Sequence, residues 1–315
     1  MKEQKMQEKS ILVVGSVNVD MVVKTPRIPS PGETILGGVF QKFEGGKGAN
    51  QAVAANAAFG GTRFCAGVGD DSFGRDYLSS LGARGINVEL VKIFKDFPTG
   101  VALITVDESG QNSITVAPGA NMALSEGDMD SIDFSAFSHV LFQLENDILT
   151  VARGLNLAKK AGCETILTPA PAKILPRDML RDIDYIVPNE IEILQIVPDC
   201  RDAEDAAQKL ISSGVKNVIV TLGKRGCNLY NAGGIKHFPT YENIRPVDTV
   251  GAGDCFTGSL AGGLKICKNL ERAIEFATAA ASLKISKMGA QSVATLEEVK
   301  KLAAQYPFAL ILTIF

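Results

Sequence analysis

The sequence has no tryptophan, only two histidines and only six cysteines among its 315 residues. The histidines, His139 and His237, lie far apart, and no two cysteines form a C-x-x-C pair. Zinc sites and Cys–His catalytic pairs are built from these residue types, so both kinds of site are disfavoured. Scattered cysteines in a chain of this length indicate free thiols in a reducing compartment, and we therefore expect a cytoplasmic protein.

Blocks of basic charge and long apolar runs are also lacking. The formal net charge is −3 and no Lys/Arg cluster stands out, so nucleic-acid binding is not predicted. The run 11–14 is too short for a signal-peptide core, and no stretch approaches the ~20 apolar residues of a membrane helix. The short apolar tail 308–315 predicts a terminal strand or a segment docked on the body.

What the sequence does contain is an alternation of short β-rich runs with helical patterns. A chain that is 46% hydrophobic has ample material for one large core. The alternation predicts an α/β fold with a doubly wound, mostly parallel sheet flanked by helices. The expected strands are 11–14, 63–68, 139–144, 165–168, 185–187 and 218–222, and the expected helices are 47–59, 73–84, 149–161, 190–196, 203–213 and 255–266.

Two stretches, residues 17–43 and 88–116, break this rhythm because they contain strand-like runs and no helix. The first holds two such runs around the turn Ser30-Pro-Gly32, and the second holds three, with a hairpin turn at Asp107-Glu-Ser-Gly110. Consecutive strands without crossover helices form antiparallel or mixed sheets. We therefore predict that both stretches build a small β-sheet lid on the α/β body of one domain, residues 1–315, and that the lid covers a site and excludes water.

The strongest chemical signal is Asp248-Thr-Val-Gly-Ala-Gly-Asp254, which runs directly into a helical pattern. Its glycines let a ligand approach the backbone, and the helix start supplies unpaired N–H groups and a partial positive charge. This combination predicts an anion hole for a transferring phosphoryl group, beside which Asp254 can accept a proton from an attacking hydroxyl. The alternative is a glycine-rich turn with Asp254 as a helix cap.

Two further glycine-containing segments carry polar side chains. Glu44-Gly-Gly-Lys-Gly-Ala-Asn50 precedes a helix but lacks the P-loop spacing, and it is either a ligand-binding loop or a tight strand-to-helix connection. Gly15-Ser-Val-Asn-Val-Asp20 lacks G-x-G-x-x-G, so it does not predict a dinucleotide site. Asn18 and Asp20 share one face of an extended segment, which suits hydroxyl recognition or is simply an exposed polar face.

Three weaker signals follow later strands. Asn189 and Glu192, in Pro188-Asn-Glu-Ile-Glu192, share a helix face and can hold a hydrated Mg²⁺ with phosphates, or can be a helix cap and a solvated carboxylate. Thr221-Leu-Gly-Lys-Arg-Gly226 ends a strand at the sheet edge where a nucleotide could bind. Glu145 follows the strand 139–144 at the same edge, as an isolated carboxylate.

Taken together, these segments resemble the ribokinase members of the PfkB carbohydrate kinase family from about Ile11 to Leu302. The segments that carry the resemblance occur in the family's order, and they are Asn18-Val-Asp20, Gly45-Gly-Lys-Gly-Ala-Asn-Gln51, Thr168-Pro-Ala-Pro-Ala172, Pro188-Asn-Glu-Ile-Glu192 and Asp248-Thr-Val-Gly-Ala-Gly-Asp254. Thr168 departs from the asparagine that the family commonly has there, and Thr278 departs from an asparagine or histidine.

The resemblance implies ATP-dependent phosphorylation of D-ribose at the 5-hydroxyl. It implies that Asp254 is the base, that Gly251, Ala252 and Gly253 form the anion hole, and that the pentose is bound by Asn18, Val19, Asp20, Gly46, Lys47, Gly48, Ala49, Asn50 and Glu145. It implies nucleotide contacts from Asn189, Thr221, Leu222, Gly223, Lys224, Arg225, Gly226, Gly253 and Thr278, with Glu192 near Mg²⁺. It further implies an activating K⁺ held by Asp248, Val250, Lys284, Lys287, Gly289 and Ser292, several of them through carbonyls.

The resemblance also implies a homodimer that forms through the β lid, whose open edges could pair with a second copy. Because Asp254 lies near a helix N-terminus, we expect a lowered pKa for its carboxyl. The alternatives are a kinase for another small sugar or nucleoside, such as 2-deoxyribose, fructose or adenosine; a binding protein without catalysis; and an NAD-dependent dehydrogenase. The intact Asp254 and its glycines argue against the second, and the missing G-x-G-x-x-G argues against the third.

Overall fold

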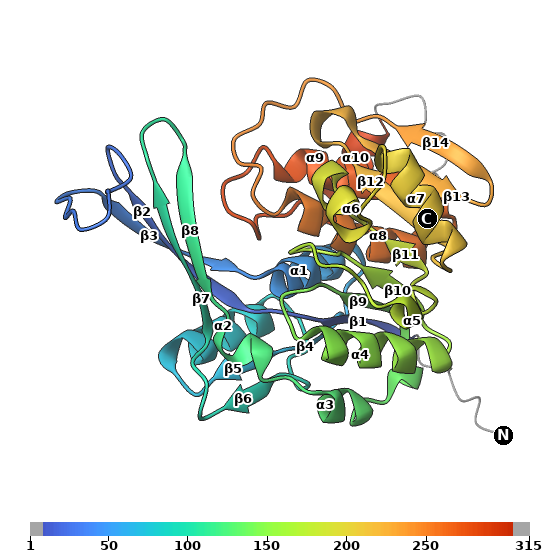
Figure 1. The fold of residues 1–315 in the computed structure, drawn as a ribbon, viewed down its shortest axis with the longest axis horizontal. Helices are drawn as coiled ribbons and strands as arrows, with labels where there is room; N and C mark the ends of the chain where they lie inside the picture. The colour runs from blue at the N-terminus through green and yellow to red at the C-terminus, as the bar shows by residue number, and fades with distance from the viewer. Residues whose placement is uncertain (1–8, 305–315) are drawn as a thin grey trace.

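The computed structural model describes residues 9–304, and its centre is an eight-stranded sheet with the strand order β14-β13-β12-β11-β10-β9-β1-β4 (Figure 1). Strands β1, β4 and β9 to β12 run parallel, and β13 and β14 add an antiparallel edge. The strands are β1 (Ser10–Val14), β4 (Arg63–Cys65), β9 (Phe137–Phe142), β10 (Glu164–Leu167), β11 (Tyr185–Ile186), β12 (Asn217–Thr221), β13 (Cys227–Asn231) and β14 (Gly234–Phe238).

Helices cover both faces of this sheet, as the sequence predicts. Side chains alternate across a strand, so Ile11 and Val13 enter one buried cluster while Leu12 enters the other. The first cluster receives α1 (Lys47–Phe59), α2 (Ser72–Ala83), α8 (Ala252–Cys267) and α9 (Leu270–Lys284). The second receives α3 (Glu126–Asp130), α4 (Ile148–Lys160), α5 (Arg177–Leu180), α6 (Glu190–Ile196) and α7 (Ala203–Ser212). Helix α10 (Leu296–Ala303) packs against α9 and α1.

Helices α1 and α8 approach each other closely because α8 carries glycines on the facing side. A Cβ atom at Gly258 would lie 2.4 Å from the Gln51 carbonyl oxygen, and one at Gly262 would lie 2.4 Å from the Ala58 Cβ. Neither contact leaves room for a larger residue. The close packing brings the N-terminal ends of both helices, with Asn50 and Asp254, to the same place.

A separate four-stranded sheet forms the lid, in the order β3-β2-β7-β8, and it projects away from the body (Figure 1). Its strands are β2 (Asn18–Lys24), β3 (Val39–Gly45), β7 (Gly100–Val106) and β8 (Asn112–Ala117). Strands β2 and β7 pair parallel while the outer pairs are antiparallel, so the sheet is mixed, as expected.

Two details of the predicted strands are wrong. The run 63–68 is two strands, because β4 joins the main sheet while β5 (Gly67–Gly69) pairs with β6 (Lys92–Phe94). Consequently β6, the first of the three runs expected in the lid stretch 88–116, is not part of the lid. The backbone segments at Gly67 and Ala120 pack closely together, since a Cβ at Gly67 would lie 2.3 Å from the Ala120 carbonyl oxygen.

Other features concern the chain as a whole. All six cysteines are free thiols, and four of them are buried. Within residues 9–304 we find no helix with both the length and the apolar character that crossing a membrane requires. Short 3₁₀ turns complete the fold at Gly119–Met122, Phe134–Ala136 and Gly223–Arg225. The apolar tail 308–315, predicted as a strand or docked segment, lies outside the described residues.

Candidate active site

The glycine-rich segment predicted as an anion hole forms the start of α8. Gly251 is the residue before the helix and has φ 75°, in the left-handed region, where glycine is strongly favoured. A Cβ at this position would also lie 2.9 Å from the Ala290 backbone. Ala252 N donates to Thr249 O, so the free N–H groups for an anion belong to the following residues of the first turn. Gly253 has open space around its Cα.

Asp254 lies inside this first turn and is only 6% exposed. One carboxylate oxygen accepts a hydrogen bond from Asn50 Nδ2 at 3.0 Å, and the other accepts from Gln51 Nε2 at 3.1 Å. We expected a lowered pKa, and this is wrong: burial raises the pKa of Asp254, Glu145 adds to the rise, and the opposing effects of Lys47, Asn50 and Gln51 are smaller. A raised pKa makes Asp254 a stronger base towards a hydroxyl proton.

Lys47 supplies the positive charge of the site. Burial by itself lowers the pKa of this side chain, but three carboxylates, those of Asp254, Glu145 and Glu192, outweigh burial and raise it. Lys47 therefore stays protonated among groups from four distant parts of the chain. A buried cation that stays charged can stabilise negative charge that develops next to it during a reaction.

Glu145 does not stand in isolation, because it fixes the loop that precedes α1. Its Oε2 accepts hydrogen bonds from the Ser16 hydroxyl and, at 3.0 Å, from the Lys47 backbone N–H. Ser16 Oγ in turn accepts from Gly48 N at 3.2 Å. The cluster ties the loop 45–51 to β1 and β9, which sets the direction of Asn50 towards Asp254.

Asn18 and Asp20 share one face of β2, as predicted, but they differ in their surroundings. Asn18 is 5% exposed and its Oδ1 accepts from Asn121 Nδ2 at 2.9 Å. Burial and then the charge of Glu145 raise the pKa of Asp20 to about 6. The Asp20 carboxylate lies against Gly45, where a Cβ would come within 2.4 Å of its Oδ2. A glycine is thus needed for this carboxylate to reach the site.

A cavity of about 420 Å³ opens on the other side of the α8 N-terminus. It collects most of the predicted nucleotide residues, namely Thr221, Gly223, Lys224, Gly226, Gly253 and Thr278. Asn189, Leu222 and Arg225 do not line it, and Arg225 instead pairs with Glu190 at 2.5 Å. Residues that the sequence did not single out, among them Tyr241 and Phe256, complete the wall. The cavity meets Asp254 through its neighbour Gly253.

Asn189 and Glu192 form a reciprocal helix cap. Asn189 Oδ1 accepts from the backbone N–H groups of Ile191 and Glu192, and Glu192 Oε2 accepts from Asn189 N at 2.8 Å. The capping alternative is thus what the structure has for Asn189. No group of three or more His, Cys, Asp or Glu side chains among residues 9–304 could hold a metal ion. Glu192, whose charge acts on Lys47, fits a Mg²⁺ that keeps most of its water and binds mainly to phosphates.

The residues expected to hold K⁺ do gather beneath the segment 248–251, yet they do not fit a free ion. Lys284 is 0% exposed, and its ammonium group donates to Asp248 O at 2.9 Å, so it already takes the oxygen that a cation would need. The Ser292 hydroxyl donates to Met288 O, and the Lys287 ammonium reaches Glu298 at 3.2 Å. The Lys284 ammonium thus takes the place beside Asp248, while the Lys284 carbonyl oxygen, the expected K⁺ ligand, accepts from Lys287 N at 2.9 Å.

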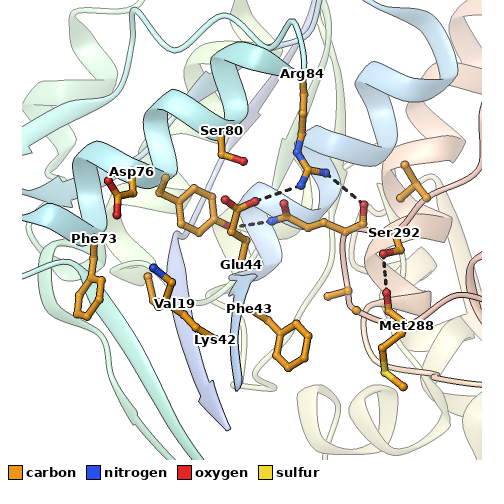
Figure 2. A pocket seen from close by; sticks show the side chains of 15 residues that line it. Val19, Lys42, Phe43, Glu44, Phe73, Asp76, Ser80, Arg84, Met288 and Ser292 are labelled. Carbon is orange, nitrogen blue, oxygen red and sulfur yellow. Dashed lines mark hydrogen bonds and ion pairs between the residues drawn. The ribbon is translucent and has the colours of Figure 1, made fainter. Parts of the chain in front are cut away.

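A second cavity, of about 730 Å³, lies at the base of the lid and is shown in Figure 2. The Arg84 guanidinium there pairs with Glu44 at 3.2 Å and donates to Gln291 O at 3.4 Å. Gln291 Nε2 donates to the Tyr77 hydroxyl at 2.6 Å and to Asn50 Oδ1 at 3.2 Å. The wall of this cavity thereby supports Asn50, one of the two residues that hold Asp254.

Sequence reasoning missed several polar residues of the site, chiefly Ser16, Asn121 and Gln143. Gln143 Nε2 donates to Gln51 Oε1 at 2.7 Å, and Gln51 Nε2 donates to Thr168 Oγ1 at 3.0 Å as well as to Asp254. Gln51 belongs to the glycine-rich loop motif and could have been found from it. Asn121 and Gln143 have no motif, and only the folded chain places them there.

The chain is similar to proteins of known activity over most of its length. The sequence pattern described as "pfkB family carbohydrate kinase" matches residues 8–297. A ribokinase of Haemophilus influenzae is 36% identical over 290 residues, which cover 90% of this chain and 94% of that protein. A bifunctional ribokinase/ribose-5-phosphate isomerase A of Fructilactobacillus sanfranciscensis is 39% identical over 92% of this chain, which spans 55% of that protein's length.

Solved structures agree with the sequence relatives. The structure of Arabidopsis thaliana ribokinase complexed with ribose and ATP has a TM-score of 0.86 and 33% sequence identity to this chain. The likeness covers 94% of this chain and 99% of that one. Fold and sequence therefore lead to the same group of proteins.

Proposed function

Because the chain belongs to the PfkB family of carbohydrate kinases, we propose that it transfers the γ-phosphoryl group of ATP to the 5-hydroxyl of D-ribose. The products are D-ribose 5-phosphate and ADP. The observation that carries the proposal is the place of Asp254. This buried carboxylate is held by Asn50 and Gln51 of the loop 45–51, and its neighbour Gly253 lines the cavity of about 420 Å³ that we propose for the nucleotide.

In the proposed mechanism the sugar lies against Asn18, Asp20 and Asn50, under the lid. Asp254 takes the proton of the 5-hydroxyl as its oxygen attacks the γ-phosphorus, and the bond from that phosphorus to the bridging oxygen of ADP breaks. The first-turn N–H groups of α8 and the Lys47 ammonium stabilise the charge on the transferring oxygens. Asn50 and Gln51 hold both Asp254 oxygens, which orients the carboxylate for this step.

Magnesium enters with ATP, as in phosphoryl transfer generally, and it neutralises charge on the phosphates when bound. Glu192, whose position is fixed by the helix cap with Asn189, would hold its water shell. No step of the proposal requires potassium, because the Lys284 ammonium already lies against Asp248.

The lid also supports the proposed homodimer. Pairing across β2 and its neighbours puts Val39, Ile114 and Val116 on the same face as Asp20, and all three are at least 50% exposed. Apolar side chains on a sheet with free edges favour pairing with a second copy. Light scattering of the purified protein tests this, and a strict monomer at micromolar concentration would argue against it.

The free thiols support a reducing compartment, and we therefore propose a cytoplasmic location. The alternative substrates remain 2-deoxyribose, fructose and nucleosides such as adenosine, since the polar face of β2 binds hydroxyl groups in general. An ATP-consumption assay over pentoses, hexoses and nucleosides decides among them. We expect ribose to give the highest kcat/KM, and a clear preference for another acceptor would overturn the substrate assignment.

A further inference from the structure

Lys284 is the last residue of α9 and one of the largest fully buried side chains of the molecule. Lysine is almost never enclosed completely unless its charge is paired. Here its ammonium donates to the Asp248 carbonyl oxygen at 2.9 Å and lies 3.9 Å from the Asp248 carboxylate oxygen Oδ2. The charge is thus paired with one residue, Asp248, through both its main chain and its side chain.

Asp248 is built into the loop that leads to the anion hole. Its Oδ1 accepts from Val250 N at 2.9 Å, and its Oδ2 accepts from Gly289 N at 2.8 Å. The backbone N–H groups of Val247 and Asp248 both donate to Ile285 O, directly after Lys284. A negative carboxylate therefore lies close beneath the turn that has to receive the phosphates, and this carboxylate needs a counter-charge.

We propose that the Lys284 ammonium is a built-in monovalent cation, which holds Asp248 and the anion-hole turn in place so that phosphoryl transfer needs no free potassium ion. An ammonium group and K⁺ carry the same charge, and both are satisfied by carbonyl and carboxylate oxygens. The tethered group is part of the chain, so its presence at the site does not depend on the salt concentration. Lys284 touches no substrate and is a positioning residue that acts through Asp248.

Truncation and isosteric replacement of Lys284 have different consequences. Lys284→Ala removes the charge and leaves a space bordered by the Asp248 oxygens, into which a potassium ion can bind. Lys284→Met also removes the charge, but its side chain fills that space with apolar atoms. If the ammonium stands in for a cation, potassium restores the first variant and not the second. If Lys284 only filled volume, the order of activities would be reversed, and Lys284→Met would be more active than Lys284→Ala with or without potassium.

The experiment measures kcat and KM for ribose with Mg·ATP in potassium chloride and in tetramethylammonium chloride at equal ionic strength. We expect potassium to change the wild-type kcat by less than about twofold. Without potassium, Lys284→Ala loses about 10- to 100-fold in kcat with little change in KM, which is less than the loss of about 10²- to 10³-fold caused by removing one anion-hole donor, because Lys284 acts indirectly. Potassium restores it along a saturable curve, while Lys284→Met stays low. Lys301→Ala, an exposed lysine on α10, is the matched control and behaves as wild type.

A second readout needs no turnover, and it separates this inference from the proposed function on which its kinetic arm rests. We expect potassium to raise the unfolding temperature of Lys284→Ala relative to tetramethylammonium, and to leave wild type and Lys284→Met unchanged. Saturable potassium activation of the wild type would overturn the inference even if neither variant folds. Full potassium-free activity of Lys284→Ala would overturn it as well. Absence of any ribose kinase activity, combined with the expected thermal shifts, would refute only the proposed function.

Discussion

The change Asp254→Asn removes the proposed base while it keeps the size of the side chain. General bases contribute about 10²- to 10⁴-fold to rate, so we expect kcat to fall by about 10³-fold, or ~4 kcal/mol of transition-state stabilisation. The raised pKa of Asp254 is in the direction that favours this role, because a stronger base contributes more to proton transfer.

The hydrogen bonds around residue 254 tell us what else this substitution changes. Both carboxylate oxygens accept from amide N–H₂ groups, of Asn50 and of Gln51, so an asparagine would place its own N–H₂ group against one of them. Gln143 Oε1 is buried without a hydrogen-bond partner in the described structure. If the side-chain amides of Gln51 and Gln143 both rotate by about 180°, Gln51 Nε2 donates to Gln143 Oε1. Gln51 Oε1 then faces residue 254 and can accept from the amide of the asparagine there. The variant should therefore remain folded and bind ribose.

A coupled assay of ADP release measures kcat, and calorimetric titration with ribose measures affinity. We expect ribose affinity within about threefold of wild type, since only the base is lost. Asp96→Asn, an exposed aspartate outside the site, is the matched control for the same chemical change. Near-normal turnover in Asp254→Asn would refute the role of Asp254 as the base, and an unfolded variant would refute the amide rearrangement.

Substitutions at Gly251, Ser16 and Asp20, with Gly253→Ala as a control for the first, test separate parts of the site. Gly251→Ala should lower kcat and cost about 1–2 kcal/mol of stability, because Gly251 has φ 75° and a Cβ there would lie 2.9 Å from Ala290. A Cβ at Gly253 meets open space, so Gly253→Ala should not lower the unfolding temperature. Ser16→Ala should raise the KM for ribose roughly fivefold with little change in kcat, since it removes hydrogen bonds that fix the loop through Glu145 and Gly48 and that contribute about 1 kcal/mol. The pKa of Asp20 in the folded state is raised to about 6, so neutral Asp20 stabilises the fold below pH 3.8 and this contribution is lost as the pH rises through 6. Urea unfolding should therefore show that wild type loses stability relative to Asp20→Asn between these two pH values. Parallel curves of stability against pH for the two proteins would contradict this.

The architecture could be predicted from the sequence where local patterns decide it. The buried runs of β1, β9 and β10 are mostly apolar, and the helices between them are long enough to show their period. The hairpin β13–β14 could not be recognised, because Asn228, His237 and Lys236 give it a polar, irregular pattern. Strands at and next to a sheet edge are set by pairing with a neighbour and less by their own composition.

Some residues of the site could likewise be predicted from the sequence, and others could not. Some site residues lie in segments that combine glycines with carboxylate or amide side chains, a combination that indicates ligand binding; these are Asp254, Asn50 and Asp20. Asn121 bonds to Val17 and Asn18 across more than a hundred residues, and no local pattern marks it. The direction of the Asp254 pKa shift was mispredicted because the helix start is visible in the sequence, whereas the burial that outweighs it arises from the packing of α8 against α1.

The most direct test of the account is to identify the product formed from D-ribose and Mg·ATP. Phosphorus NMR of the reaction mixture assigns the phosphate to a sugar carbon through its coupling to the attached protons. The account predicts a single sugar phosphate with its phosphate coupled to the two protons of C5, and no product when 5-deoxyribose replaces ribose. A phosphate on another carbon, or ATP consumption unchanged with 5-deoxyribose, would contradict it.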